Sequence, residues 1–333
     1  MNILVIGGAG YIGSHMVKML IEHGHDVTVL DNLSTGHKDA IHPSAKFMFG
    51  DLANSHQLNQ ALMPGFDGVM HFASFIQVGE SISHPGKYYR NNLSNTLNLL
   101  DEMVATGNKQ LIFSSTAAIF GNPEYTPIDE SHSCHPINPY GRTKLMVEQA
   151  LADYDRAYGL RSISLRYFNA ASATPDASIG ERHDPETHLI PLVLHTAQGR
   201  REYIQVFGND YDTPDGTCIR DYIHVDDLCT AHLLALNALA SGALSNTYNL
   251  GNGQGFSVNE IIAEAKKITG RNISVHIAPR RPGDPARLIA DSSKAFRELG
   301  WQPKHADIER IIEDAWRFEL QQNPPQAFPS PLL

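Results

Sequence analysis

Residues 1–15 of the chain read MNILVIGGAGYIGSH. The segment Asn2–Ile6 is apolar and rich in Ile, Leu and Val, so it predicts a buried β-strand. Glycines follow at positions 7, 8, 10 and 13, and the sequence then continues with a helical pattern. A strand, a glycine-rich turn and a helix, in this order, are typical of the first unit of a doubly wound α/β fold.

Apolar strands and helical patterns continue to alternate through the first half of the chain. Further strands are predicted over Asp26–Leu30, Lys46–Gly50, Gly68–Ala73, Gln110–Ser114 and Ser162–Tyr167. Two long helices are predicted over Val78–Val104 and Pro139–Tyr158. Strands that are apolar throughout and separated by helices belong to a parallel sheet covered on both faces. We therefore predict a Rossmann-type doubly wound parallel sheet of the α/β class.

The chain changes in character after Asn169. Residues 170–191 are rich in small residues, Pro, Asp and His, and predict an extended loop. Short strands and helices follow at Ile204–Phe207, Val225–Leu239, Thr247–Leu250, Val258–Thr269, Ile273–Ala278 and Ile308–Leu320, before a proline-rich tail, NPPQAFPSPLL. We predict a first domain over residues 1–169, to which a segment near 225–253 returns, and a smaller mixed α/β C-terminal substrate lobe over residues 170–333.

The composition excludes several classes of protein. The chain of 333 residues has a formal net charge of −10, which argues against binding to nucleic acid or to an anionic membrane. Cys134, Cys218 and Cys229 form no CxxC motif and fit a reducing compartment. No apolar run is long enough to cross a bilayer, and the N-terminus reads as a strand rather than a signal peptide. We expect a cytoplasmic protein.

The glycine-rich turn has the spacing of a dinucleotide site. Gly8, Gly10 and Gly13 satisfy Gly-x-Gly-x-x-Gly, and Gly7 starts a second, overlapping pattern with the last two. Glycines let the backbone approach a pyrophosphate, which rests on the amides of the following helix. Asp31 ends the second predicted strand, where a carboxylate accepts from ribose hydroxyls and repels a 2′-phosphate. This favours NAD over NADP as the cofactor.

A tyrosine and a lysine lie four positions apart in the run NPYGRTKLMVE. Asn138 suits the N-cap and Pro139 the first helical position, so Tyr140 is expected in the first helical turn. Lys144 then lies on the same face of the helix. The helix dipole, the ammonium and an oxidised nicotinamide should all lower the pKa of the phenol. Tyr140 is therefore a candidate general base for taking a proton from an alcohol.

Polar residues at other strand ends admit two interpretations each. Ser114, Ser115 and Thr116 close the fifth predicted strand, at the edge where open α/β sheets bind ligands. Thr116 can bond the reacting hydroxyl there, or it can simply cap the next element. Asp51 follows the third strand and is as compatible with capping the next helix as with an adenine contact. A Tyr–Lys pair also occurs by chance, but its place after these features favours a catalytic pair.

The motifs GGAGYIGSH, SST, YGRTK, RYFN, FGNDY and RDYIHVDDL together resemble those of the extended short-chain dehydrogenase/reductases, and most closely the nucleotide-sugar 4-epimerases among them. The resemblance covers nearly the whole chain. It implies a homodimeric isomerase that holds NAD and interconverts UDP-glucose and UDP-galactose by transient oxidation at sugar carbon 4. Tyr140 is then the base, Lys144 its partner and the anchor of the ribose, and Thr116 the third catalytic residue.

The resemblance also implies two sets of binding residues. The positions that correspond to NAD contacts, besides Tyr140 and Lys144, are Gly7, Gly10, Tyr11, Ile12, Gly13, Asp31, Asn32, Asp51, Leu52, Phe72, Ala73, Asn91 and Phe168. The positions that correspond to nucleotide-sugar contacts are Thr116, Asn169, Leu189, Phe207, Arg220, Tyr222, Arg281, Asp284 and Leu288.

Two arginines and one aromatic residue in the second lobe suit a nucleotide diphosphate. Arg220 and Arg281 can clamp phosphates through charge-assisted hydrogen bonds. Phe207 offers an aromatic face for uracil. Each arginine taken singly is also compatible with a surface ion pair, with Asp221 or Asp284 as the partner.

Two positions depart from the pattern of the best-known epimerases. Ile76 replaces a lysine near the cofactor phosphates, which could weaken the retention of NAD. Leu288 stands where epimerases restricted to unacetylated sugars often have tyrosine. A smaller side chain leaves room beside carbon 2 of the sugar. We therefore expect the UDP-N-acetylhexosamines to be accepted as well.

Two alternative functions were weighed against epimerisation. A nucleotide-sugar dehydratase or decarboxylase of the same superfamily is the nearest, but dehydratases carry an acid pair after the catalytic threonine, where this chain has Ala117 and Ala118. A catalytically silent NAD-binding regulator is the second, and the intact Thr116, Tyr140 and Lys144 argue against it.

No metal site and no partner besides a second copy of the chain were predicted. Among the 17 histidines, His132 and His135 cluster with Cys134 in SHSCHP, but no second cluster supplies tetrahedral spacing. We interpret this run as a polar loop. The two long predicted helices are expected to form the homodimer interface.

Overall fold

The computed structural model describes residues 1–281 and 284–324, so most of the proline-rich tail lies outside the described residues. A seven-stranded sheet forms its centre, and every neighbouring pair of strands runs parallel. The strands are β1 (Asn2–Ile6), β2 (Asp26–Asp31), β3 (Lys46–Phe49), β4 (Gly68–His71), β5 (Gln110–Thr116), β6 (Arg161–Tyr167) and β10 (Asn246–Leu250). Their order is β10-β6-β5-β4-β1-β2-β3. The predicted doubly wound sheet is confirmed, and its order reverses between β1 and β4.

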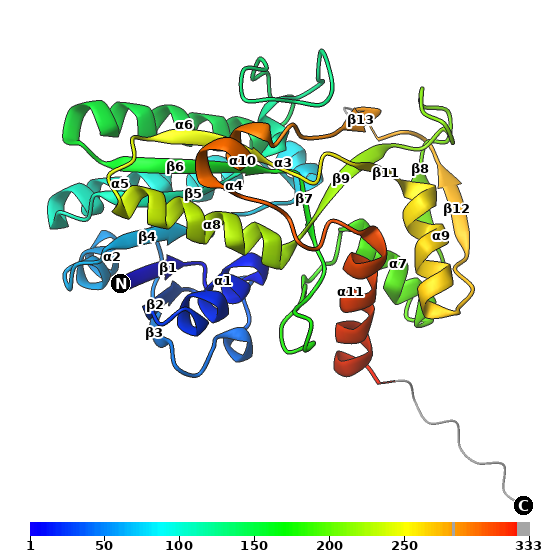
Figure 1. The fold of residues 1–333 in the computed structure, drawn as a ribbon, viewed down its shortest axis with the longest axis horizontal. Coiled ribbons are helices and arrows are strands. Elements are labelled where there is room, and N and C mark those ends of the chain that lie inside the picture. The colour runs from blue at the N-terminus through cyan, green and yellow to red at the C-terminus, as the bar shows by residue number, and fades with distance from the viewer. Residues whose placement is uncertain (282–283, 325–333) are drawn as a thin grey trace, which may run out of the picture.

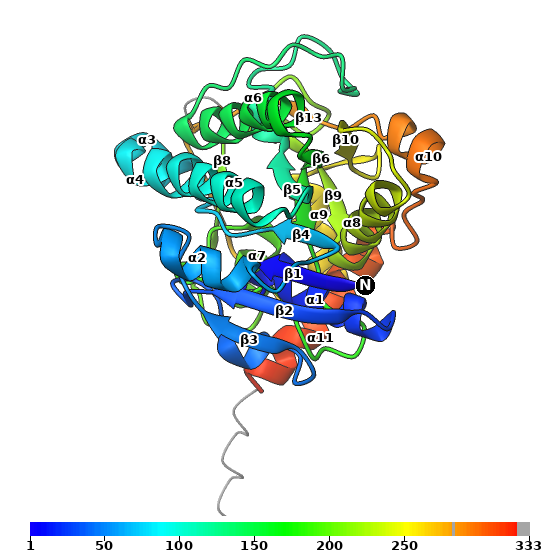
Figure 2. The same ribbon diagram turned by 90° about the vertical axis from the view of Figure 1, so that its left-hand side faces the viewer.

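Helices cover both faces of this sheet (Figure 2). One face carries α1 (Tyr11–Glu22), α8 (Val225–Ala240) and α10 (Ser293–Leu299), and the other carries α2 (Ser55–Leu62), α5 (Asn95–Thr106) and α6 (Pro139–Tyr158). Successive side chains of a strand point to opposite faces. In β1, Ile3 and Val5 accordingly join one buried cluster while Leu4 and Ile6 join the other. The central strands β1 and β4 are buried along almost their whole length because helices cover both faces.

The prediction of one long helix over Val78–Val104 is wrong, because the structure divides this range into several elements. The structure has α3 (Val78–Ser83), α4 (Pro85–Tyr88), a π-helical turn η2 (Tyr89–Ser94) and then α5. The break lies at His84, whose ψ of 56° is not helical, directly before Pro85. Proline disfavours a helical conformation at the preceding residue and provides no amide for the hydrogen-bond ladder. The apolar periodicity continues across this break, so pattern alone did not reveal it.

The second lobe lies beside the carboxyl ends of the sheet strands (Figure 1). It contains the strands β7 (Asn169–Ala171), β8 (Ile204–Phe207), β9 (Ile219–His224), β11 (Gly255–Ser257), β12 (Val275–Ala278) and β13 (Arg287–Leu288), with the helices α7 (Leu189–Ala197), α9 (Val258–Thr269) and α11 (Ile308–Gln322). β8 pairs with β12, and β9 pairs with β7, β11 and β13. The three helices pack on one another around a buried apolar cluster.

Two differences from the predicted elements matter for the site. The loop predicted to extend to residue 191 ends earlier, because α7 begins at Leu189 and tolerates Pro191 in its first turn. The strand β9 was not predicted, although it is the centre of the small sheet. In the part of the chain that the structure describes, no helix has both the length and the apolar character needed to cross a membrane.

Candidate active site

The glycine turn after β1 is packed against the chain that follows β4. A Cβ atom on Gly7, whose φ is +80°, would lie 2.5 Å from the amide nitrogen of Ala73. A Cβ on Gly13 would lie 2.1 Å from the carbonyl oxygen of Gly7. The structure therefore brings Gly7, Gly13, Phe72 and Ala73 together at the point where the strand order reverses. Open α/β sheets bind their ligands at this point.

Gly10 has no comparable packing reason to be glycine. Among the described residues, a Cβ there would meet only the carbonyl oxygen of Gly7, at 3.4 Å. Gly10 is also the N-cap of α1, and no described side chain caps this helix end. The free amides of Tyr11 and Ile12 thus begin a helix whose positive end is open to an anion. The turn fits the pyrophosphate of a dinucleotide, which explains the third glycine.

The side chain of Tyr11 is engaged within the protein. Its hydroxyl donates to the carbonyl oxygen of Ser172 at 2.7 Å. Burial raises the pKa of this phenol well above its usual value, and nearby Glu181 raises it further. Tyr11 therefore offers a cofactor its backbone amide, while its ring fastens α1 to the segment that follows β7.

Asp31 holds the end of β2 against the glycine turn. One carboxylate oxygen accepts from the amide of Ala9 at 2.9 Å, and the other accepts from the amide of Leu33 at 2.8 Å. The side chain is 9% exposed, and each oxygen retains a lone pair for a ribose hydroxyl. The fixed negative charge is the feature that disfavours a 2′-phosphate.

Asp51 does not cap α2. The N-cap of this helix is Asn54, whose side chain accepts from the amide of Gln57. Asp51 instead accepts from the amide of Ala53 at 2.8 Å and from the side-chain amide of Asn32 at 2.8 Å. The capping alternative is therefore wrong, and the structure joins Asn32 and Asp51, with the buried Leu52 beside them, at the edge beyond β2 and β3.

The π-helical turn η2 contains a positioning residue that the sequence did not reveal. Asn92 is 3% exposed and accepts from the amide of Phe75 at 2.9 Å while donating to its carbonyl oxygen at 2.9 Å. Asn91, an expected NAD contact, donates to Asn92 at 3.0 Å. Asn92 thus holds the loop after β4, in which Ile76 is 37% exposed. Asn92 is recognisable as a positioning residue only because it is buried, and burial cannot be read from the sequence.

The start of α6 has the predicted form. Asn138 accepts from the amide of Gly141 at 2.8 Å and is the N-cap, and Pro139 occupies the first helical position. Tyr140 lies in the first turn and is 9% exposed, and Lys144 is 4% exposed. The Lys144 Nζ atom donates to the carbonyl oxygen of Ser114 at 2.8 Å and lies 6.0 Å from the centre of the Tyr140 ring.

The electrostatics of this pair differ from the prediction. Burial raises the pKa of Tyr140, and a hydrogen bond with Thr116 offsets only part of this effect. Burial also lowers the pKa of Lys144 to about 7, against the opposing effect of Glu148. The expectation that the protein's own groups lower the tyrosine pKa is therefore wrong. Removal from water penalises both charged forms, and this effect is larger than the opposing effects of Thr116 on the tyrosine and of Glu148 on the lysine.

Thr116 has the capping role that was one of its two interpretations, and its contact with the reacting hydroxyl stays a prediction. It is the last residue of β5 and accepts from the amide of Ala118 at 3.1 Å, so it caps the 3₁₀ turn η3 (Ala117–Ile119). The same side chain lies near the Tyr140 phenol and lowers its pKa against the larger effect of burial. Ala117 then packs in a small apolar cluster with Phe120, and Phe168 lies against this cluster.

Leu288 reaches the same cluster from the second lobe. It lies on β13, which pairs with β9 so that Leu288 is opposite Arg220. Its side chain packs against the cluster that contains Ala117, next in the chain to Thr116. On the neighbouring strands, Asn169 is opposite Tyr222, and Tyr222 is 4% exposed. The structure therefore brings these expected substrate residues to the catalytic side of the sheet.

The remaining expected substrate residues form two pairs. The guanidinium of Arg281 lies 3.9 Å from the centre of the Phe207 ring, and Arg220 forms an ion pair with Asp284. Asp221 takes no part in this pair. It is fully buried and accepts from the amides of residues 252, 253 and 290 at 2.7–3.1 Å. The structure thus selects Asp284 from the two partners considered. Leu189, the first residue of α7, packs beside this lobe's core.

Comparisons with known proteins agree with this arrangement. The sequence profile of the NAD dependent epimerase/dehydratase family matches residues 3–251. A UDP-glucose 4-epimerase from Streptococcus mutans is 53% identical over 96% of both chains. The crystal structure of UDP-glucose 4-epimerase from Brucella ovis in complex with NAD superposes with a TM-score of 0.93 at 47% identity, covering 95% of this chain and 98% of that one.

A third relative concerns the range of substrates. The structure of the UDP-Glc/GlcNAc 4-epimerase from Campylobacter jejuni superposes with a TM-score of 0.84 at 46% identity, covering 96% of this chain and 99% of that one. The matches to whole chains extend over both lobes. The chain belongs to the NAD dependent epimerase/dehydratase family and, within it, to the UDP-glucose 4-epimerases.

Proposed function

We propose that the chain interconverts UDP-glucose and UDP-galactose, with NAD retained as a prosthetic group. One observation carries the proposal: Tyr140, Thr116 and Lys144 are buried together, Thr116 lies close enough to Tyr140 to lower the pKa of its phenol, and Ala117 and Ala118 follow Thr116. This arrangement has a base for an alcohol but lacks the acid pair that a dehydratase requires. We further propose that residues 1–169, with α8 and β10, bind NAD and that the remainder binds the UDP-sugar.

Proton transfer at carbon 4 of the sugar is assigned to Tyr140. The phenol takes the proton from the 4-hydroxyl and later returns it to the oxygen after the sugar has turned over. When bound, NAD supplies the acceptor and donor of the hydride at carbon 4. Thr116 holds the reacting hydroxyl beside the tyrosine. Burial raises the pKa of Tyr140, so a positive charge bound beside the phenol would favour its ionised form.

Lys144 has the role of anchoring rather than of proton transfer. Its ammonium is held by the carbonyl oxygen of Ser114 at the end of β5, close to Tyr140. A ribose hydroxyl that bonds to this ammonium would stabilise its charge in the buried site, where the pKa of the lysine is otherwise lowered.

The second lobe is assigned to the nucleotide. Arg220 can exchange its present partner Asp284 for diphosphate oxygens, and Arg281 can leave the Phe207 ring to do the same. The face of Phe207 is then free for uracil. Firm contacts to the nucleotide and few to the sugar allow the 4-keto sugar to rotate without leaving. The division is supported by the location of both arginines in the second lobe, whereas Tyr140, Lys144 and Thr116 belong to the first.

A single incubation tests the function. Purified protein mixed with UDP-galactose should produce UDP-glucose without added NAD, followed by liquid chromatography of the nucleotide sugars. A dehydratase would instead yield a 4-keto-6-deoxy sugar, a decarboxylase would release carbon dioxide from a UDP-uronic acid, and a silent regulator would leave the substrate unchanged. A strict requirement for added NAD would contradict its role as a prosthetic group.

Substrate range is predicted to depend on Leu288. We propose that the chain also acts on UDP-N-acetylglucosamine and UDP-N-acetylgalactosamine, in line with the similarity to the enzyme from Campylobacter jejuni. The Leu288→Tyr variant should lose N-acetyl turnover by on the order of 10- to 100-fold, since steric rejection in such a pocket amounts to ~1–3 kcal/mol. Turnover of UDP-galactose should be retained.

The matched control is Leu288→Met, which conserves volume and should keep activity on all four sugars. Initial rates on the four UDP-sugars, for wild type and both variants, measure the effect. Wild-type protein without N-acetyl turnover would contradict the proposal, and so would a Leu288→Tyr variant that gains it.

We also propose that the protein works as a homodimer in the cytoplasm. Free thiols at positions 134, 218 and 229 support a reducing compartment. The 20-residue helix α6 packs beside α5 on one face of the sheet and exposes 39% of Met146. Sedimentation equilibrium of the purified protein tests the dimer, and a monomer at micromolar concentration would contradict it.

A further inference from the structure

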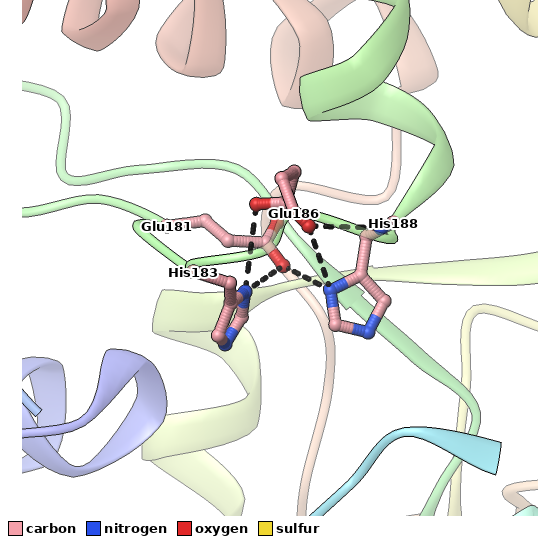
Figure 3. A group of neighbouring side chains, drawn as sticks. All are labelled: Glu181, His183, Glu186 and His188. Atoms are coloured by element: carbon pink, nitrogen blue, oxygen red, sulfur yellow. Dashed lines mark hydrogen bonds and ion pairs between the residues drawn. The ribbon is translucent and has the colours of Figure 1, made fainter. Parts of the chain in front are cut away.

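Four potential metal ligands converge in the segment between β7 and α7 (Figure 3). Glu181, His183, Glu186 and His188 each direct one carboxylate oxygen or Nδ1 atom to a common point, and these atoms all lie within 4.8 Å of one another. All four come from the stretch ERHDPETH, which has two glutamates and two histidines in alternation. No step of the proposed reaction uses any of these side chains.

Three separations among these side chains lie near the spacing of tetrahedral ligands, two of them to different carboxylate oxygens of Glu186. The Nδ1 atom of His183 lies 3.2 Å from Glu181 Oε1 and 3.5 Å from Glu186 Oε2, and the Nδ1 atom of His188 lies 3.4 Å from Glu186 Oε1. Ligands about 2.0–2.1 Å from a tetrahedral Zn²⁺ are separated by about 3.3–3.4 Å. The fourth contact, from His188 Nδ1 to Glu181 Oε1, is shorter at 2.6 Å. An ion between these two atoms requires them to separate by less than one ångström.

Three of the converging atoms are buried without a hydrogen-bond partner among the described residues, whereas Glu186 Oε1 accepts from the amides of Thr187 and His188 at 2.7 and 2.8 Å. Within the described part of the chain, Glu181 Oε1 and the Nδ1 atoms of His183 and His188 have no partner with hydrogen-bond geometry. The Glu181 side chain is only 5% exposed. The alternative to a metal is two imidazolium–carboxylate ion pairs. Such pairs are strongest when an N–H group points at a carboxylate oxygen, and the Nδ1 atoms of His183 and His188 lack that geometry. Buried polar atoms without partners are unusual, whereas lone pairs that converge on a cation are expected in a metal site.

We propose that Glu181, His183, Glu186 and His188 bind a divalent transition-metal ion, with Zn²⁺ as the expected occupant. Two imidazole nitrogens and two carboxylate oxygens form a closed set of four protein ligands, which is characteristic of structural rather than catalytic zinc. The sequence does not single out this set, because its four members look like charged residues of an irregular loop.

The place of the cluster in the fold indicates what the metal does. Arg182 pairs with Asp39 beyond β2 at 2.9 Å, and the ring of His183 lies 6.2 Å from that of Tyr11 at the start of α1. His188 immediately precedes Leu189, an expected substrate contact. A metal here would fasten the chain that crosses from the NAD side to the substrate lobe, and it would fix the position at which α7 begins.

Metal content of the intact protein tests the proposal without using activity. Protein purified without a metal-affinity tag, loaded with Zn²⁺ and passed over a desalting column should retain about one zinc per chain by elemental analysis. Stripping with a chelator should lower the melting temperature, and restoring Zn²⁺ should recover it, because an ion that binds only the folded state stabilises it. Cobalt substitution should produce the visible absorption of tetrahedral Co²⁺.

Variants identify the ligands. Glu181→Gln and His183→Gln should each lose the bound zinc and the response of the melting temperature, whereas the control His135→Asn, in the unrelated SHSCHP loop, should keep both. Wild-type protein that retains no zinc, or ligand variants that retain a full equivalent, would overturn the proposal. If the ligand variants do not fold, the metal content and chelator response of the wild type decide. The metal measurements and the epimerase assay are independent tests. Absence of zinc would overturn the metal site and leave the proposed epimerase function standing.

Discussion

Tyr140→Phe is expected to lower the turnover number for UDP-galactose by roughly 10²–10⁴-fold, the contribution typical of a positioned general base. The substitution removes a single hydroxyl from a side chain that is 9% exposed, so the ring keeps its packing. It also removes the hydrogen bond with Thr116, which is the one neighbouring group that lowers the pKa of the phenol. The variant should therefore remain folded and keep NAD while losing the group that moves the proton.

The matched control is Tyr158→Phe, the same change near the end of the same helix. Tyr158 is 53% exposed, and its replacement should leave turnover within about twofold, as is usual for surface positions. Circular dichroism and the NAD released on denaturation should be unchanged in both variants. Near-normal turnover in Tyr140→Phe would refute the assignment of the base, and loss of NAD would show that the tyrosine has a binding role as well.

Gly13→Ala is expected to abolish the retention of NAD and to lower turnover by on the order of 10²-fold, since a displacement of about 1 Å can have that effect on catalysis. The new Cβ would lie 2.1 Å from the carbonyl oxygen of Gly7 and 2.9 Å from the Cα of Gly8. These are backbone atoms, so the clash can be relieved only by moving the turn away from α1. The same movement would displace the amides that the pyrophosphate requires.

Gly79→Ala is the control for this experiment. Gly79 lies in the helix α3, and a Cβ there meets no described atom within 4 Å. Alanine is up to about 1 kcal/mol better than glycine in a helix, so this variant should be as stable as wild type or slightly more stable. The ratio of absorbance at 260 and 280 nm reports bound NAD in both proteins. Full NAD content in Gly13→Ala would contradict the role given to the turn.

Much of the fold follows from local pattern. The six strands predicted in the first half are all present, because each combines apolar side chains with turn residues at its ends. The start of α6 is also predictable, since a cap depends only on Asn138 and the amide of Gly141 three residues later. The helix over residues 78–104 shows the limit of this approach, because a periodic apolar face continues through the break at Pro85 and conceals it.

The catalytic residues could be named from the sequence, but their chemical state could not. Proximity of Tyr140 and Lys144 follows from helical spacing, and it suggested a lowered phenol pKa. The structure buries both side chains, and desolvation raises the tyrosine pKa and lowers that of the lysine. Burial depends on β5, η2 and the second lobe, which are remote in the chain, so spacing along one helix cannot report it.

The sequence alone determined the doubly wound sheet, the preference for NAD and the residues of the catalytic helix, because hydrophobic period, glycine spacing and capping act between near neighbours. Only the tertiary structure decided that Asp284 pairs with Arg220, that Asn92 clamps the loop after β4, and that four ligand atoms in ERHDPETH converge. The first two depend on contacts between distant segments. The third depends on how an irregular loop is held between α1 and α7, which no repeating pattern in the chain encodes.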